Sequence, residues 1–172
     1  LLVAGLLGCA VLPLALARTP PPARPATVKP EVFTLIRTAP VAAVATLIAG
    51  AANGSYWSLA PVFGLVGGLS NGQISAFLTA TVVGSALAIW PLGRLSDRMD
   101  RRVILSAQMG VAIVFELVLA SVGTRLGWGT AVLGFLLGGS AMTIYSIAMS
   151  HANDRADPSR SVGIASSLLF FY

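Results

Sequence analysis

Four long apolar runs constrain this chain more than any other feature of its sequence. Each run is long enough to cross the roughly 30 Å hydrocarbon core of a bilayer as a helix, which takes about 20 residues. None of them alternates apolar and polar residues as the wall of a membrane barrel does. The runs therefore predict an all-α fold, a polytopic bundle of transmembrane helices. They occupy residues 39–66, 73–92, 103–122 and 128–150.

Composition supports the membrane class and excludes several others. Charged residues make up 10% of the chain and hydrophobic residues 56%, whereas soluble domains carry about 25% charged residues. The same numbers exclude a disordered chain, and a single cysteine, Cys9, excludes a disulfide-stapled secreted domain. The net charge of +5 comes from basic residues diluted among apolar runs, not from one basic face. We therefore expect the lipid bilayer as a partner and no nucleic acid.

Two further apolar runs, residues 1–17 and 162–172, stand at the ends of the chain. A membrane helix has polar flanks that anchor it at the interface, so we expect a fragment cut inside a helix at each end. Residues 18–38 between the first two runs are rich in proline, which favours an extended, solvated linker. This linker is the predicted domain boundary, and residues 39–172 belong to the second bundle. The prolines are Pro20, Pro21, Pro22, Pro25 and Pro30.

The basic residues predict which side of the membrane each loop occupies. Ten of the 11 lie in the linker, in the segment 93–102 and in the loop 151–161. The loops 67–72 and 123–127 hold only Arg125. Because Lys and Arg resist translocation, the linker and the two basic loops are predicted to be cytoplasmic. A multi-pass protein of a bacterial inner membrane is expected.

A signal peptide over residues 1–18 is the alternative for the first run, because residues 6–9, LLGC, resemble a lipoprotein cleavage box. No basic n-region is visible before it, however, and the apolar residues continue past Cys9 to Ala17. Export would also carry the basic linker across the membrane. The charge pattern therefore favours a membrane helix, with Cys9 as a small apolar residue within it.

The ten residues Gly93–Arg102, GRLSDRMDRR, form the most specific string in the chain. They lead directly into the run 103–122, which predicts a very tight turn with a helix end on either side. Gly93 permits close approach of another backbone. Asp97 is an acid among arginines, and its carboxylate can cap a helix N-terminus or accept forked hydrogen bonds from a guanidinium group. The arginines are Arg94, Arg98, Arg101 and Arg102.

This string resembles the G-x-L-x-D-R-x-x-R-R signature of the major facilitator superfamily, found at the loops between helices two and three and between helices eight and nine. Its place after the proline-rich linker identifies it as the second copy. The six apolar runs then resemble helices six to eleven, an incomplete C-terminal half whose partner is the missing N-terminal six-helix bundle. Asp100 departs from the pattern, which commonly has Gly there. Residues 54–61 and 145–155 look like the YcaD-like branch of bacterial members.

The resemblance implies a carrier that moves a small solute by alternating access between two rocking bundles. We expect a secondary carrier coupled to protons, with efflux of drug-like or metabolite solutes favoured over uptake. In the family the signature Asp is thought to hold the cytoplasmic gate closed. Asp97 is therefore expected to pair with the arginines and with the N-terminus of the last run near residues 159–163. The predicted gate residues are Gly93, Arg94, Asp97, Arg98, Arg101 and Arg102.

Other interpretations remain open beside the gate. Asp97 can simply cap a helix while the arginines enforce topology. A non-transporting scaffold or sensor can use the same fold. An enzyme is not expected, because the sequence has no nucleophile elbow, phosphate loop, His–Glu metal pair or dinucleotide fingerprint.

Two apolar runs carry polar residues that predict a substrate cavity. The run 39–66 exceeds one bilayer core, and Asn53–Ser55 and Pro61 are expected to break it. Broken helices line cavities in carriers, because their freed backbone groups need water or ligand. The alternative roles are an outer aromatic belt and hydrogen bonds between helices. The cavity candidates are Asn53, Tyr56, Trp57 and Ser58 in this run, and Thr143, Tyr145 and Ser146 in the run 128–150.

The same run 128–150 has a small-residue face, which predicts close helix packing. Its members are Gly134, Gly138, Gly139, Ser140 and Ala141.

Glu116 is the only acid inside a complete apolar run, on a polar and small face with Gln108. An intramembrane carboxylate suggests a functional site, so proton coupling is one hypothesis. The other is a hydrogen-bonded structural acid, which the resemblance favours because the ninth helix of the family is usually peripheral.

His151 lies near two aspartates, but no second histidine or cysteine is close enough to suggest a metal site. We expect no metal and no cofactor, only a coupling proton. Ser70 and Gln73 predict a capping box that opens the run 73–92.

Overall fold

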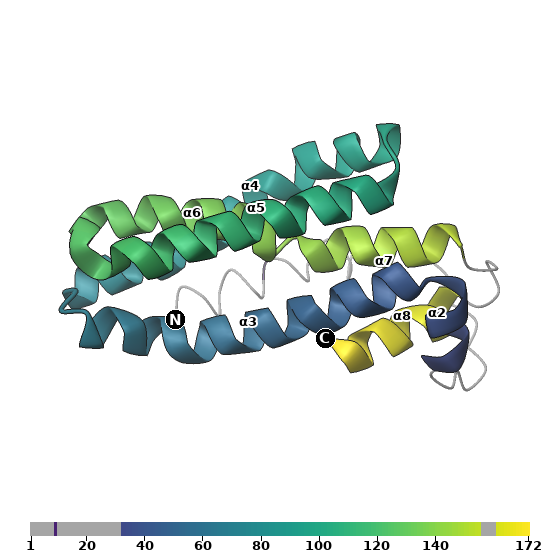
Figure 1. The fold of residues 1–172 in the computed structure, drawn as a ribbon, viewed down its shortest axis with the longest axis horizontal. Coiled ribbons are helices and arrows are strands. Elements are labelled where there is room, and N and C mark those ends of the chain that lie inside the picture. Colours follow the sequence, from purple (N-terminus) through teal and green to yellow (C-terminus); the bar gives the residue numbers. More distant parts are fainter. Residues whose placement is uncertain (1–8, 10–31, 156–160) are drawn as a thin grey trace.

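The computed structural model describes Cys9 and residues 32–155 and 161–172. Within this part every element is helical, which confirms the predicted all-α class. The helices run along one long direction, with the chain turns gathered at two ends (Figure 1). Most of the first run and all prolines of the linker lie outside the described residues. The elements are α2 (Val32–Thr38), α3 (Pro40–Val66), α4 (Asn71–Arg98), α5 (Arg101–Val122), the 3-10 helix η1 (Gly123–Gly129), α6 (Thr130–Ala141), α7 (Ile144–Asp154) and α8 (Ser161–Phe171).

By length and composition, two helical stretches could cross a membrane, Asn71–Arg98 and Arg101–Asp154. The helices α2 and α3, bent by 116°, could together form a third. The stretch Arg101–Asp154 is not one rod, because it reverses at η1, where Gly127 has φ 55° and ψ −115°. Glycine adopts such a backbone without a Cβ clash. The chain therefore goes along the bundle as α5 and returns as α6 and α7 (Figure 1).

Helix α4 begins with the predicted capping box. The amide of Gln73 donates to Ser70 Oγ at 3.3 Å, and the amide of Ser70 donates to Gln73 Oε1 at 2.8 Å. Each residue thus satisfies a backbone donor that the helix end would leave free. The prediction of a capping box is confirmed.

At its other end, α4 continues through the signature string to Arg98, so the predicted turn over Gly93–Arg102 is wrong for most of its length. Only Met99 and Asp100 lie between α4 and α5. Asp100 is the N-cap of α5, and its Oδ1 accepts the amide of Arg102 at 2.9 Å. The reversal thus falls where this carboxylate can satisfy a helix donor.

The predicted break of the run 39–66 is wrong. Helix α3 is continuous over 27 residues and holds Pro61 in its interior. A proline removes one backbone hydrogen bond, and a helix in a membrane tolerates this loss when its neighbours compensate. Asn53 does not interrupt the helix either, because its amide donates to the hydroxyl of Tyr172 and not to the α3 backbone.

The run 128–150, predicted as one helix, is instead broken in two. Helix α6 ends at Ala141 and α7 begins at Ile144. Thr143 Oγ1 at the break donates to the carbonyl of Gly139 at 2.8 Å. Such back-bonding of a hydroxyl to the preceding turn often bends helices. Here the same hydroxyl also accepts the Gln108 amide from α5, a contact that hydrophobicity alone did not indicate.

The linker prediction also fails at its C-terminal end. Residues 32–38 form the helix α2, whereas an extended segment was expected up to residue 38. The last linker proline is Pro30, so nothing in the sequence VFTLIRT removes a backbone donor. Leu35 of α2 is fully buried in a core with α3, α5, α7 and α8, and this burial gives a short helix a tertiary reason to form.

Helices α4 and α6 pack with their backbones in contact, which confirms the predicted small-residue packing face. A Cβ atom added to Gly138 of α6 would stand 1.9 Å from the carbonyl oxygen of Thr81. One added to Gly84 of α4 would stand 2.0 Å from that of Phe135. Only glycine permits this distance, because real Cβ atoms do not approach a backbone oxygen so closely.

The end of the bundle opposite the signature string is held by a neutral contact. There Thr124 Oγ1 of η1 donates to the carbonyl oxygen of Gly67 at 2.5 Å, just after α3. The α3–α4 turn and the α5–α6 turn therefore meet at this end (Figure 1).

Candidate functional site

A chain of two ion pairs joins three helices at the end that carries the signature string. Arg101 of α5 contacts Asp97 of α4, with 3.2 Å between Nη2 and Oδ1. Its Nε contacts Asp154 Oδ2 of α7 at 2.7 Å. The Arg101 side chain is 19% exposed, while the two carboxylate side chains are 67% and 55% exposed. We call this set, Asp97, Arg101 and Asp154, the ion-pair chain.

The remaining signature residues do not join the ion-pair chain. The guanidinium carbon of Arg94 lies 4.0 Å from the ring centroid of Trp90, a cation–π contact. Arg98 and Arg102 are exposed. The expected contact with residues 159–163 falls partly outside the described residues, so it stays a prediction.

Two cavities adjoin the ion-pair chain. One of about 420 Å³ is bordered by Asp97, Asp100, Arg101, Asp154 and His151. His151 is 4% exposed, and its Nε2 has no hydrogen-bond partner within the part of the chain that the structure describes. The sequence analysis did not predict this burial.

The second cavity, of about 210 Å³, brings two predicted sites together. Asp97, Arg101 and Gly93 of the predicted gate line it beside Thr143 and Ser146 of the predicted substrate cavity. Sequence reasoning treated the two groups separately.

Tyr56 and Glu116 border a third cavity, of about 390 Å³, whose walls are otherwise mainly apolar. Thr81 Oγ1 donates to the carbonyl of Phe77, so the Tyr56 hydroxyl donates to Thr81 over 2.5 Å. Glu116 is exposed, and no hydrogen bond or ion pair from a described residue reaches its carboxylate. The cavity thus places one carboxylate beside aromatic and apolar surface.

Asn53 and Tyr145 meet through a residue that sequence reasoning did not single out. The Asn53 amide donates to the Tyr172 hydroxyl. The rings of Tyr145 and Tyr172 are in contact, with centroids 4.5 Å apart and planes tilted by 37°. This contact joins α3, α7 and the end of α8. Trp57 packs edge-on against Tyr56, with centroids 5.3 Å apart and 43% of its surface exposed, and Ser58 is exposed.

In the structure the predicted site residues fall into three groups, which differ from the predicted gate, substrate cavity and coupling site. Each group also contains a residue that sequence reasoning missed: Asp154 in the ion-pair chain, Tyr172 beside Asn53, and Thr81 beside Tyr56. Of these three residues, only Asp154 could have been predicted from the sequence as a partner of an arginine, because it is an acid at a helix end in a basic loop. In the described ranges, no group of three or more His, Cys, Asp and Glu side chains could hold a metal ion.

Comparison with known proteins decides the family. The sequence profile described as Major Facilitator Superfamily matches residues 1–172, the whole length of the chain. The chain belongs to the major facilitator superfamily. An uncharacterized MFS-type transporter named YcaD from Escherichia coli (strain UMN026) is 31% identical over 126 residues, which cover 73% of this chain and 32% of that protein. Uncharacterized MFS-type transporters from Yersinia pestis (strain Pestoides F) and Yersinia pseudotuberculosis (strain IP 31758) are each 29% identical with the same coverage.

No solved structure matches the chain significantly. The matched part spans about a third of the length of these curated relatives. Family membership and the apolar helices make this a multi-pass membrane protein of the major facilitator superfamily. The predicted resemblance, to the family and to its YcaD-like members, is confirmed.

Proposed function

We propose that the full-length protein is a secondary carrier that moves a small solute across a bacterial inner membrane by alternating access. This chain then supplies the central linker and most of the C-terminal bundle, with the N-terminal bundle as its partner. Family membership supports transport as the general activity. The observation that carries the proposal for this chain is the ion-pair chain, since it joins α4, α5 and α7 at the signature string.

The ion-pair chain is suited to a reversible gate because each of its contacts is weak. Exposed ion pairs contribute about 0–1 kcal/mol each, and Asp97 and Asp154 are both more than half exposed. Two such contacts hold three helix ends together without fixing them permanently. In our proposal this end is cytoplasmic, the contacts form when that side is closed, and they separate when it opens.

We place the solute path along Tyr56 and Glu116, where a carboxylate borders a cavity of about 390 Å³. No described residue binds this carboxylate, and a carboxylate in a membrane segment is a candidate for function. Glu116 is therefore the proposed site of proton coupling, and no other cofactor is needed. The proposed direction is efflux.

Proton flux and solute efflux in vesicles that hold the full-length protein test the gate. Asp97→Asn removes the pairing charge, and we expect it to reduce wild-type flux about tenfold. Asp100→Asn is the matched control: it removes the same charge from the same string, but Asn caps a helix as well as Asp. We expect Asp100→Asn to transport like the wild type.

Each outcome of this experiment has a distinct meaning. Equal flux in the wild type and Asp97→Asn would keep the carrier and discard the gate role of Asp97. Equal losses in both variants would assign the effect to net charge and not to the ion pair. Absence of flux with a broad solute panel would favour the non-transporting scaffold or sensor.

Glu116→Gln separates proton coupling from solute binding. We expect it to abolish proton-driven efflux while solute exchange at equal concentrations on both sides persists, because exchange needs no net proton movement. Glu116→Asp keeps the carboxyl group and should retain coupled efflux. Full proton-driven efflux in Glu116→Gln would refute the coupling role.

A further inference from the structure

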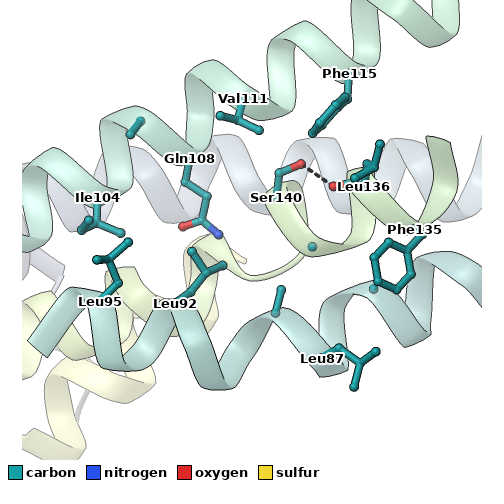
Figure 2. Close-up of a pocket in the computed structure, with 14 residues that line it drawn as sticks. Leu87, Leu92, Leu95, Ile104, Gln108, Val111, Phe115, Phe135, Leu136 and Ser140 are labelled. Carbon is teal, nitrogen blue, oxygen red and sulfur yellow. Dashed lines mark hydrogen bonds between the residues drawn. The ribbon is translucent and has the colours of Figure 1, made fainter. Parts of the chain in front are cut away.

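A largely apolar cavity of about 450 Å³ lies between α4, α5 and α6, and it shares Leu92 with the 210 Å³ cavity beside the ion-pair chain. Its walls come from Leu92 and neighbours on α4, Gln108 and neighbours on α5, and Phe135 and neighbours on α6 (Figure 2). None of its lining residues is charged.

One buried polar atom in the wall of this cavity lacks a partner. Gln108 is 5% exposed, and its Nε2 donates to Thr143 Oγ1. Its Oε1 has no hydrogen-bond partner among the described residues. The Ser140 hydroxyl cannot supply one, because it donates to the carbonyl of Leu136 at 2.8 Å. Figure 2 shows the Gln108 amide pointing from α5 toward Leu92 across the cavity.

This arrangement defines the chemistry of a ligand. A buried amide oxygen without a partner is costly, so a hydrogen-bond donor at this position is favoured. The rest of the ligand must be apolar to match the walls. It must also be uncharged, because no lining side chain could neutralise a charge taken out of water.

We infer that this cavity binds an uncharged, mainly apolar molecule with one hydroxyl group, which donates its hydrogen bond to Gln108 Oε1. The molecule enters from the bilayer, where such compounds dissolve. This site is separate from the Tyr56 and Glu116 cavity, so the inference does not depend on the proposed transport activity.

Photolabelling of the full-length protein in phospholipid vesicles tests the inference directly. The probe is octanol that carries a diazirine, and the matched probe is the corresponding octane without the hydroxyl. We expect the octanol probe to label peptides from residues 84–95 and 104–115, and unlabelled octanol to compete. Gln108→Leu should reduce octanol labelling about tenfold, the effect of one buried hydrogen bond. The octane probe should label both proteins equally.

Two further variants separate the cavity from general effects on folding. Gln108→Leu also removes the hydrogen bond from Gln108 Nε2 to Thr143 Oγ1. Thr143→Val removes this bond too but keeps the Gln108 Oε1 acceptor, so octanol labelling should persist. Ala107→Leu fills the cavity from its α5 wall and should reduce labelling by both probes. Equal labelling of wild type and Gln108→Leu by octanol would overturn the inference. So would labelling spread over all helices, or its absence from these two peptides, because the cavity would then be filled by water or by another part of the protein.

Discussion

Helix α3 and the pair α6–α7 differ in whether their apolar runs form a continuous helix. Helix α3 contains Pro61 and a central Asn53, yet it is continuous over 27 residues. The run that forms α6 and α7 has no proline before its break, yet it is interrupted at Met142 and Thr143. Proline content therefore does not decide where this bundle bends.

The difference lies in what the polar side chains bond to. Near the end of α6 and in the break that follows it, the hydroxyls of Ser140 and Thr143 both donate to carbonyls four residues earlier in the chain. Gln108 of α5 also donates to Thr143 from outside the helix. In α3, by contrast, Asn53 bonds to Tyr172 of another segment. Back-bonding to a carbonyl does not by itself break a helix, because Thr81 makes the same bond inside the continuous α4. The break at Thr143 differs in the added contact from Gln108 of α5.

The strongest test of this comparison is the glycine contact that fixes α6 against α4. Gly138→Ala should lower the free energy of unfolding of the full-length protein by about 3 kcal/mol, because the added Cβ would meet the Thr81 carbonyl and the backbones would have to separate. Thermal denaturation in detergent measures this change. Gly110→Ala in α5 is the control, because its Cβ would have no atom within 4 Å, and it should not destabilise. Similar losses in both variants would contradict the packing explanation.

The next largest effect is expected at the break itself. Thr143→Val keeps the side-chain shape but leaves the Gln108 amide without its acceptor, so it should cost about 1–3 kcal/mol of unfolding free energy. Thr143→Ser keeps the hydroxyl and should cost much less. A denaturant titration measures the free energy of unfolding of the two variants. If they are equally stable, the Thr143 hydroxyl does not stabilise the structure at the break.

A smaller effect is expected where α3 meets α4. Tyr56→Phe removes the hydrogen bond to Thr81 and should cost about 1 kcal/mol. Ser58→Ala, on the exposed surface of the same helix, should change stability by less than about 0.5 kcal/mol. Unfolding midpoints measured under one set of conditions provide the comparison. A larger loss in Ser58→Ala than in Tyr56→Phe would contradict it.

The smallest effect is expected at the proline. Pro61→Ala restores one backbone hydrogen bond, worth about 0.5–1.5 kcal/mol. It also frees the unfolded chain, which costs about 0.4–1 kcal/mol. The two nearly cancel, so thermal stability should be almost unchanged. An increase in the free energy of unfolding well above about 1.5 kcal/mol, the most that one hydrogen bond supplies, would show that α3 is interrupted at Pro61 in the bilayer.

Sequence reasoning could predict the class of fold and the approximate places of the long helices α3, α4 and α5, because hydrophobic run length is a local property. The capping box at Ser70 and Gln73 and the packing role of Gly138 were predictable for the same reason. The break at Thr143 was not, because it depends on Gln108, a residue 35 positions away. The signature string showed that Asp97 lies among arginines, but not that Arg101 would reach Asp154 on a third helix.

The two ends of the bundle are held by contacts that respond differently to dissolved salt. Ions screen the exposed charges of the ion-pair chain, since the Debye length falls to about 8 Å at 0.15 M ionic strength. The bond from Thr124 to Gly67 at the opposite end joins neutral groups and is insensitive to screening. Raising the ionic strength therefore loosens the bundle from one end only. The salt concentration of a purification buffer therefore affects how closely α4, α5 and α7 are held at the end of the ion-pair chain, and it can be varied without any mutation.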